Sequence, residues 1–447
     1  MTTRGPSERG SSSPISAQAR DRNALFDWDA HHAAHGTSRA GAPKRWWSTR
    51  RFRRTVISIT AVGVVVLVGY LVVPASWYDQ AAYERSQGFG RYGDQLDGKT
   101  RAALNKELPQ LEEFVARHRG GAFLHPVPVE FLPDDQFVSR LGPSDGAGAD
   151  DAVALGFAKS RQDYQQQLQQ LQTEGIVGVY DNDEQTLYIR GQTLDDYANV
   201  VLVHELTHAY DDQHYHLTAI EDQADSGDDA AAAATAVIEG DASAVEDTYA
   251  ETLPEGKRCE VLTAARQPYD RACRAAGYTE ADESFDAVGT ALEARLQFPY
   301  TAGERFIATI ARLGGQRAVD QALEHPPVDT AQIIDPEQYL RHRSVAVVPY
   351  PHHAGQRAGS LGALELSILL TGGRLTVDGS NYLFGWSGDS HITFQSHRHD
   401  CLIDRVQLDN STNADKAAAR FRTWTRSGKD RSYQRENANT IAFTSCN

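Results

Sequence analysis

The chain has 447 residues and an ordinary apolar content of 40%, which suffices for two or three domains with at least one large core. Its net charge of −16 argues against a general nucleic-acid-binding protein, so no nucleic-acid partner is expected. The charge is divided unevenly, because residues 1–73 carry a net +7, which leaves −23 for the remainder. A basic head and an acidic body indicate two different environments.

An uncharged apolar segment lies between the head and the body. Residues 55–73 match the length of a helix that crosses a bilayer. Lysine and arginine residues precede this segment, and tryptophan and tyrosine residues flank it, which places the N-terminus in the cytoplasm. We therefore expect a disordered basic cytoplasmic tail over 1–54, a single-pass anchor in the cell membrane over 55–73, and an extracytoplasmic body. A cleaved signal peptide is disfavoured because the leading region and the apolar run are both long.

The cysteines fit an extracytoplasmic body, because all four follow the apolar segment. Of the three possible pairings, two local disulfides, Cys259–Cys273 and Cys401–Cys446, are favoured. No C-x-x-C spacing is present, which argues against a zinc site built from cysteine.

Residues 74–98 are expected to form a linker before a mainly helical region. Apolar residues at helical spacing predict a helix over 99–118, which Pro109 should interrupt or kink. The next elements expected are a strand over 127–132, a Gly/Asp-rich loop over 143–151 and a Gln-rich helix over 154–174.

Residues 176–190 give the clearest hairpin signal, with two β-rich runs around an Asp-Asn-Asp turn. The hairpin leads directly into the next helix. A strand in this position could pair with an extended substrate backbone or serve structure alone, and the sequence leaves both readings open.

The helix after the hairpin carries the pattern H-E-x-x-H at His204, Glu205 and His208. Thr193 is expected to cap it, and the polar residues 211–213 should close it. Histidines four residues apart on a helix can reach one metal ion, with the intervening glutamate beside a bound water. This arrangement is typical of zinc hydrolases.

A catalytic zinc ion needs a third protein ligand, and two candidates compete for this position. His214 has the spacing of an extended H-E-x-x-H motif, but Asp211 stands where that motif has glycine, and no methionine follows residue 1. Glu239 lies on an Ala-rich helix expected over 230–251, after an acidic loop over 222–229, and Gly240 beside it would let two helices approach closely. A carboxylate from a second helix completes a His₂Glu site, so Glu239 is favoured. Asp212 and Asp241 are candidate partners for the ligating histidines.

The remaining chain is expected to change near residue 357 from a mainly helical region to a mixture of strands and helices. Before it, a largely helical stretch over 285–313 should break at Phe298-Pro299-Tyr300, and 326–339 should be irregular. After it, the sequence predicts a helix over 361–370, a strand, turn and strand over 382–395, a strand over 401–408, a helix over 412–425 and a strand over 440–446.

Several of these motifs together resemble a family of bacterial predicted neutral zinc metallopeptidases, with similarity over roughly residues 100–446. The similarity rests on His204-Glu205-Leu206-Thr207-His208-Ala209-Tyr210-Asp211-Asp212-Gln213-His214, Glu239-Gly240-Asp241-Ala242, Phe298-Pro299-Tyr300 with Gly303 and Phe306, and Gly385-Trp386-Ser387-Gly388-Asp389. The family is similar to gluzincins in this helix and its distal glutamate. The resemblance implies Zn²⁺ at His204, His208 and Glu239, with Glu205 as the catalytic base.

The expected fold class is α+β, with a mainly helical zincin-like core over 99–350 and a small α+β lobe over 357–447. The expected function is hydrolysis of peptide bonds in a peptide or protein substrate. An inactive membrane-anchored scaffold and a zinc amidase acting on the cell wall are the alternatives. The residue that stabilises the oxyanion is left open among Tyr249, Tyr300, Arg305 and His391.

Overall fold

The computed structural model describes residues 96–447 except 142–147, 225–227, 266–270, 277–290, 350–356, 377–378 and 397–398. The described residues belong to one compact unit. The predicted tail and anchor, and the linker up to residue 95, lie outside the described residues. Within the described part of the chain, no helix combines the length and the apolar character needed to span a bilayer.

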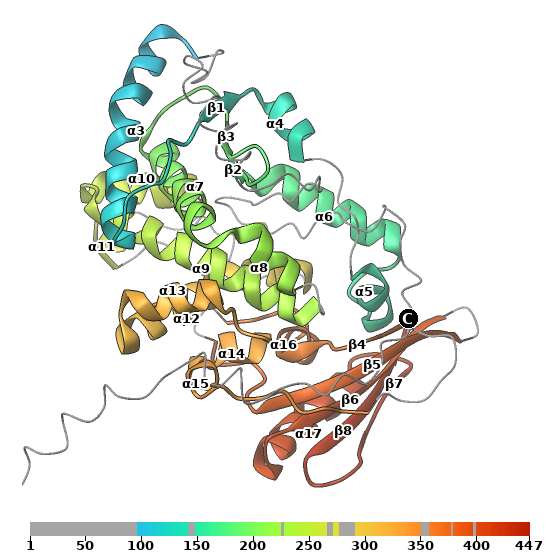
Figure 1. Cartoon of the computed structure of the whole chain (residues 1–447). Helices are drawn as coiled ribbons and strands as arrows, with labels where there is room; N and C mark the ends of the chain where they lie inside the picture. Colours follow the sequence, from blue (N-terminus) through green and yellow to red (C-terminus); the bar gives the residue numbers. More distant parts are fainter. Residues whose placement is uncertain are drawn as a thin grey trace, which may run out of the picture. The chain divides into compact units, whose positions relative to one another are not determined.

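The fold is mixed α+β and mainly helical, with two small sheets (Figure 1), as the sequence predicts at this level. The first half contains α3 (Gly98–Arg119), β1 (Val129–Leu132), α4 (Asp134–Leu141), α5 (Ala149–Leu155), α6 (Arg161–Gly175), β2 (Gly178–Asp181), β3 (Thr186–Arg190), α7 (Asp196–Tyr215), α8 (Leu217–Ala224) and α9 (Asp228–Thr252). The second half contains α10 (Glu255–Ala264), α11 (Arg271–Ala275), α12 (Ala291–Gly314), α13 (Gln316–Glu324), α14 (Thr330–Ile334), α15 (Pro336–Leu340), β4 (Arg357–Gly359), α16 (Gly362–Thr371), β5 (Trp386–Ser396), β6 (His399–Leu408), α17 (Ser411–Arg426), β7 (Arg431–Arg435) and β8 (Thr440–Cys446).

The first sheet confirms the predicted hairpin. β2 and β3 pair antiparallel, with Val179 opposite Tyr188, and β1 adds to the other side of β3 in parallel. The strand order is β1-β3-β2, so β2 lies at the edge. Apolar side chains from this sheet, α3 and α7 share one buried cluster, which fixes the hairpin against α7.

The second sheet has the order β4-β5-β6-β8-β7, and α17 packs on it. The predicted strands over 401–408 and 440–446 and the helices over 361–370 and 412–425 are confirmed, with small shifts at their ends. Of the strand, turn and strand predicted over 382–395, the second strand is confirmed as part of β5. The first strand is wrong, because residues 382–385 form no strand and the chain turns at Gly385, whose φ is +79°. The short strands β4 and β7 were not predicted.

Two proline residues lie inside continuous helices, so the predicted interruptions of these helices are wrong. Pro109 lies on the exposed side of α3, where the carbonyl of Asn105 that loses its N–H partner can face water. Pro299 is buried within α12, and the helix continues through it because both of its halves pack against α9 and the surrounding core.

Both favoured cysteine pairs are at bonding distance. The sulfur atoms of Cys259 and Cys273 are 2.05 Å apart, and those of Cys401 and Cys446 are 2.09 Å apart. The second pair joins residues that are directly opposite on β6 and β8. The bond therefore ties the last strand to the centre of its sheet.

Helices α9 and α12 approach each other closely at two glycines. A Cβ atom on Gly303 would lie 2.0 Å from the carbonyl oxygen of Ala236, and one on Gly240 would lie 2.2 Å from the carbonyl carbon of Gly303. These contacts involve backbone atoms, so no side chain can move away to make room. The close approach predicted for Gly240 is confirmed, with α12 as the neighbouring helix.

We expect Gly303→Ala to lower the free energy of unfolding by about 1–3 kcal/mol, because the new methyl group forces α9 and α12 apart. Chemical denaturation of the metal-free protein measures this change. Gly256→Ala is the matched control, since a Cβ atom there meets nothing within 4 Å in α10, and alanine should be neutral or stabilising. Equal stability of the Gly303 variant and the wild type would contradict the close packing.

Candidate metal centre

Helix α7 carries the two histidines through the middle of the core. Its residues are buried from Val200 to Gln213, as expected for a helix that other elements surround. The predicted cap at Thr193 is wrong, because Asp195 caps the helix and its side chain accepts from the Ala198 N–H. The helix also continues past the predicted end at 211–213 to Tyr215, where His216 adopts a left-handed conformation.

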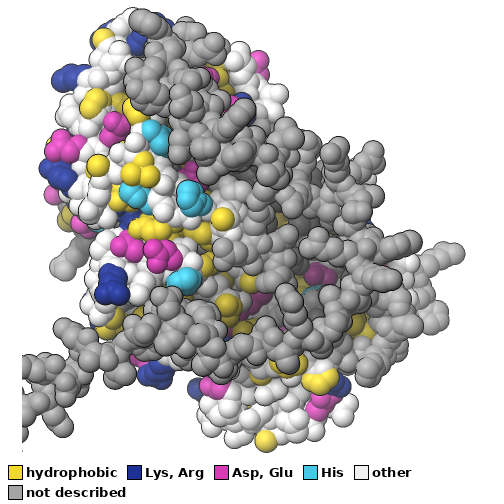
Figure 2. All heavy atoms as spheres, in the orientation of Figure 1, with side chains coloured by type: hydrophobic (Ala, Val, Ile, Leu, Met, Phe, Trp, Pro, Cys, Tyr) yellow, Lys and Arg dark blue, Asp and Glu magenta, His cyan; other side chains and the backbone are white. Residues whose placement is uncertain are grey.

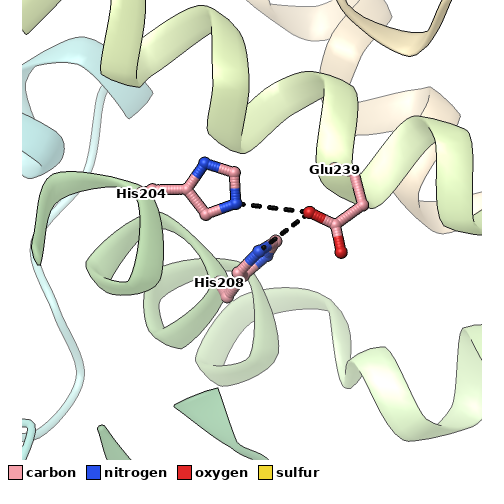
Figure 3. A group of neighbouring side chains, drawn as sticks. All are labelled: His204, His208 and Glu239. Carbon is pink, nitrogen blue, oxygen red and sulfur yellow. Dashed lines mark hydrogen bonds and ion pairs between the residues drawn. The ribbon is translucent and has the colours of Figure 1, made fainter. Parts of the chain in front are cut away.

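The structure brings His204, His208 and Glu239 together (Figure 3). Glu239 Oε2 lies 3.2 Å from His204 Nε2 and 3.4 Å from His208 Nε2. One donor atom from each residue lies within 4.8 Å of the others, and this is the single such group among the described residues. All three side chains are buried, so they do not reach the face of mixed acidic, basic and apolar side chains in Figure 2.

These distances fit a tetrahedral zinc ion. Ligand atoms about 2.05 Å from such an ion lie about 3.3 Å apart, which matches both separations. The donor set of two imidazoles and one carboxylate is one that zinc prefers. His208 Nε2 and Glu239 Oε1 are buried without a hydrogen-bond partner in the described part of the chain, a costly condition that coordination would relieve. The residues present therefore fit a bound metal ion.

Charge interactions keep Glu239 in the form that binds a cation. Burial alone would raise the pKa of this carboxyl, but the facing His208 and His204 lower it to about 2. The same carboxylate, together with Glu246, raises the pKa of His204 against the opposing effect of burial. The centre is thus a compact cluster with strong internal attraction.

Glu205 lies beside the histidines, on the side of α7 that faces β2. A Cβ atom on Gly178 would lie 2.9 Å from both Cγ and Oε1 of Glu205, so the strand passes directly over this carboxyl. Neither carboxyl oxygen has a hydrogen bond of ordinary geometry within the described residues. Burial raises the pKa of Glu205 to about 8, and the neighbouring His204 partly offsets this. Such a carboxyl can exchange a proton near neutral pH.

Glu246 supports His204, and the sequence did not predict it. Its Oε2 lies 2.8 Å from His204 Nδ1, which orients the ring so that Nε2 points at Glu239. The signal was available, because Glu246 follows Glu239 by two helical turns and must share its face of α9. The partners that were predicted are wrong: Asp212 accepts from the Tyr180 hydroxyl and the Leu217 N–H, and Asp241 pairs with Arg119.

We expect Glu246→Ala to weaken zinc binding by about 10- to 100-fold, because His204 loses the group that fixes its ring and tautomer. Competition with a chromophoric chelator measures the affinity. Glu260→Ala on α10 is the control and should bind as the wild type does. Unchanged affinity in the Glu246 variant would show that the contact does not support the ligand.

His214 does not join the cluster. It lies in the last turn of α7, where its Nε2 is 3.0 Å from the carbonyl oxygen of Ala122. The chain makes no reversal there that could return it to the metal ligands. Of the two third ligands considered, the structure therefore places Glu239 with the histidines.

The four candidates for oxyanion stabilisation differ in whether they contact the proposed metal ligands. The Tyr300 ring stacks on the ring of His204, with 6.1 Å between their centroids. Tyr249 packs against Phe114, Arg305 donates to the Thr301 carbonyl, and His391 lies 3.4 Å from Asp151 next to the second sheet. Tyr300 is thus the candidate in contact with a ligand of the centre.

No family model and no curated protein matches the chain. Among solved structures, the chain is similar to one from Chloroflexus aurantiacus described as a candidate hydrolase with a novel fold, at 15% sequence identity and a TM-score of 0.30. The match covers 61% of this chain and 98% of the other. A similarity of this degree carries no argument about the fold or the function of this chain.

Proposed function

We propose that the chain is a membrane-anchored, extracytoplasmic zinc peptidase of the gluzincin-like family that its motifs resemble. The observation that supports this proposal is the convergence of His204, His208 and Glu239 from two helices, with Glu205 buried beside them. Zn²⁺ suits the donor set and the ligand separations. The anchor and the extracytoplasmic location rest on the sequence of residues 55–73 and on the four cysteines.

In this proposal His204, His208 and Glu239 hold the ion, and a bound zinc ion supplies a Lewis acid for the scissile carbonyl and the attacking water. Glu205 then takes a proton from the water on its carboxylate and delivers it to the leaving nitrogen. Glu246 holds His204 in the required tautomer through Nδ1. The Tyr300 ring stacks against His204 from α12.

The edge of β2 offers a place for an extended peptide. Within the described residues β2 pairs only with β3, so no strand occupies its other edge there. The strand passes over Glu205 at Gly178, which would bring a peptide paired with β2 close to the base. This placement supports an extended peptide or protein as the substrate.

The test is zinc analysis of the purified full chain together with hydrolysis of denatured casein and of cell-wall fragments. The proposal expects about one zinc ion per chain, cleavage of casein, and loss of cleavage with a chelator. Bound zinc without turnover of either substrate would favour the scaffold function. Cleavage of wall fragments alone would favour the amidase function, and a protein that binds no zinc would contradict all three.

A further inference from the structure

The last residue of α3 is a buried arginine that contacts three other helices. The Arg119 side chain is 0% exposed, and its Nη2 donates to Asp211 Oδ1 on α7 at 2.9 Å. Its Nε lies 3.1 Å from Asp241 Oδ2 on α9, and its Nη1 lies 3.5 Å from Asp320 Oδ1 on α13. The guanidinium group also lies over the rings of Tyr210 and Tyr215, at 5.6 and 5.8 Å from their centroids.

The two closest carboxylates lie next to the metal ligands in the sequence. Asp211 follows His208 by three residues, about one helical turn, and Asp241 follows Glu239 by two residues. Arg119 therefore bridges the two helices that supply every proposed ligand. Arg119 Nε and Nη2 both donate to Asp211 Oδ1, and the charge of the same guanidinium attracts Asp241 at 3.1 Å. A planar guanidinium suits this task because it presents its donors and its charge in a fixed arrangement.

Apolar packing near the ligands does not replace this bridge. The residues of α9 just before Glu239, Ala236 to Ile238, belong to the cluster formed with α8, α12, α13 and α16. The buried apolar residues of α7 from Val201 to Tyr210 belong to a different cluster with α3 and the first sheet. Helix α9 adds Val245 and the partly buried Tyr249 to this cluster, both on the C-terminal side of Glu239. At the level of the ligands, α7 and α9 are joined by the polar contacts of Glu239 with both histidines and of Glu246 with His204.

We propose that Arg119 is a positioning residue that sets the separation of α7 and α9, and with it the distances from Glu239 to His204 and His208. The inference rests on the proposed metal centre. It adds a residue outside the ligands that fixes the distances between the ligand atoms. Separations of 3.2 and 3.4 Å between ligand atoms tolerate little movement. A small change in helix separation should therefore alter affinity and coordination geometry even in a well-folded protein.

The experiment measures Co²⁺ binding to the metal-free full chain, by affinity and by the visible absorption spectrum that reports coordination geometry. Arg119→Lys keeps the charge but lacks the planar fork. The triple variant Arg119→Met, Asp211→Asn, Asp241→Asn removes the three buried charges, so the fold can persist. Asp320, the fourth charged group, is 33% exposed and can be solvated without the arginine. Arg343→Met is the control, because Arg343 pairs with Asp329 at 3.3 Å at the start of α14, an element that carries no ligand.

We expect the lysine variant and the triple variant to unfold cooperatively, to bind Co²⁺ about 10- to 100-fold more weakly than the wild type and to show altered spectra. The control should keep the wild-type affinity and spectrum. A folded lysine or triple variant with wild-type affinity and spectrum would overturn the role of Arg119. A wild-type chain that binds no Co²⁺ would instead contradict the metal centre itself, so the two failures are distinguishable.

Discussion

Glu205→Gln is expected to lower peptide hydrolysis by about 10²- to 10⁴-fold while the zinc content stays at the wild-type level. The glutamine has the same size and fills the same buried space between α7 and β2, but its amide cannot accept a proton from water. The side chain is not among the ligands, so the metal should remain bound. Casein hydrolysis and zinc analysis of the same preparation measure both quantities.

The pH dependence gives a second readout of the same variant. A carboxylate base loses its function as pH falls through its pKa, and burial raises the pKa of Glu205, so wild-type activity should decline toward acidic pH. The residual activity of the glutamine variant should lack this decline. Glu112→Gln, at a half-buried carboxyl on α3, should behave as the wild type does. A fully active Glu205 variant would exclude the proposed base.

The elements that position the centre could be predicted from the sequence because their signals are local. The H-E-x-x-H pattern, the Ala-rich run around Glu239 and the β-rich runs before His204 each fix one element by periodicity or composition. Their contact belongs to the tertiary structure, but it could be predicted from the number and kind of ligands that zinc requires. A catalytic zinc ion needs a third ligand, and Glu239 on a second helix was favoured over His214.

The errors arose where tertiary packing overrides local preference. Proline predicts a break, yet Pro299 lies inside a continuous α12, because buried residues on both sides of it belong to one core cluster with α9. The helix is capped by Asp195 and not by Thr193, because both residues, two positions apart, carry a side-chain oxygen suited to an N-cap. Asp241 was expected at a histidine but pairs with Arg119, which lies 122 residues earlier and carries no sequence signal of its partner.

Glu239→Ala is expected to abolish zinc binding at micromolar metal, whereas His214→Ala should leave it unchanged. Removing Glu239 takes away the one carboxylate that faces both histidines and leaves His204 and His208 as the two remaining donors. Two ligands do not complete the three-residue set that holds a catalytic zinc ion. Zinc analysis after dialysis against a weak chelator measures the difference between the two variants.

The comparison of these variants separates the two possible third ligands without reference to activity. His214 contacts the Ala122 carbonyl at the end of α7, so its loss should cost only local stability there. Glu239→Gln refines the result, because the amide keeps the shape and one oxygen donor but loses the charge that neutralises the cation. We expect it to bind zinc more weakly than the wild type and more tightly than the alanine variant. If His214→Ala lost the metal and Glu239→Ala kept it, the third ligand would be His214, and α7 would have to bend after His208 to bring it there.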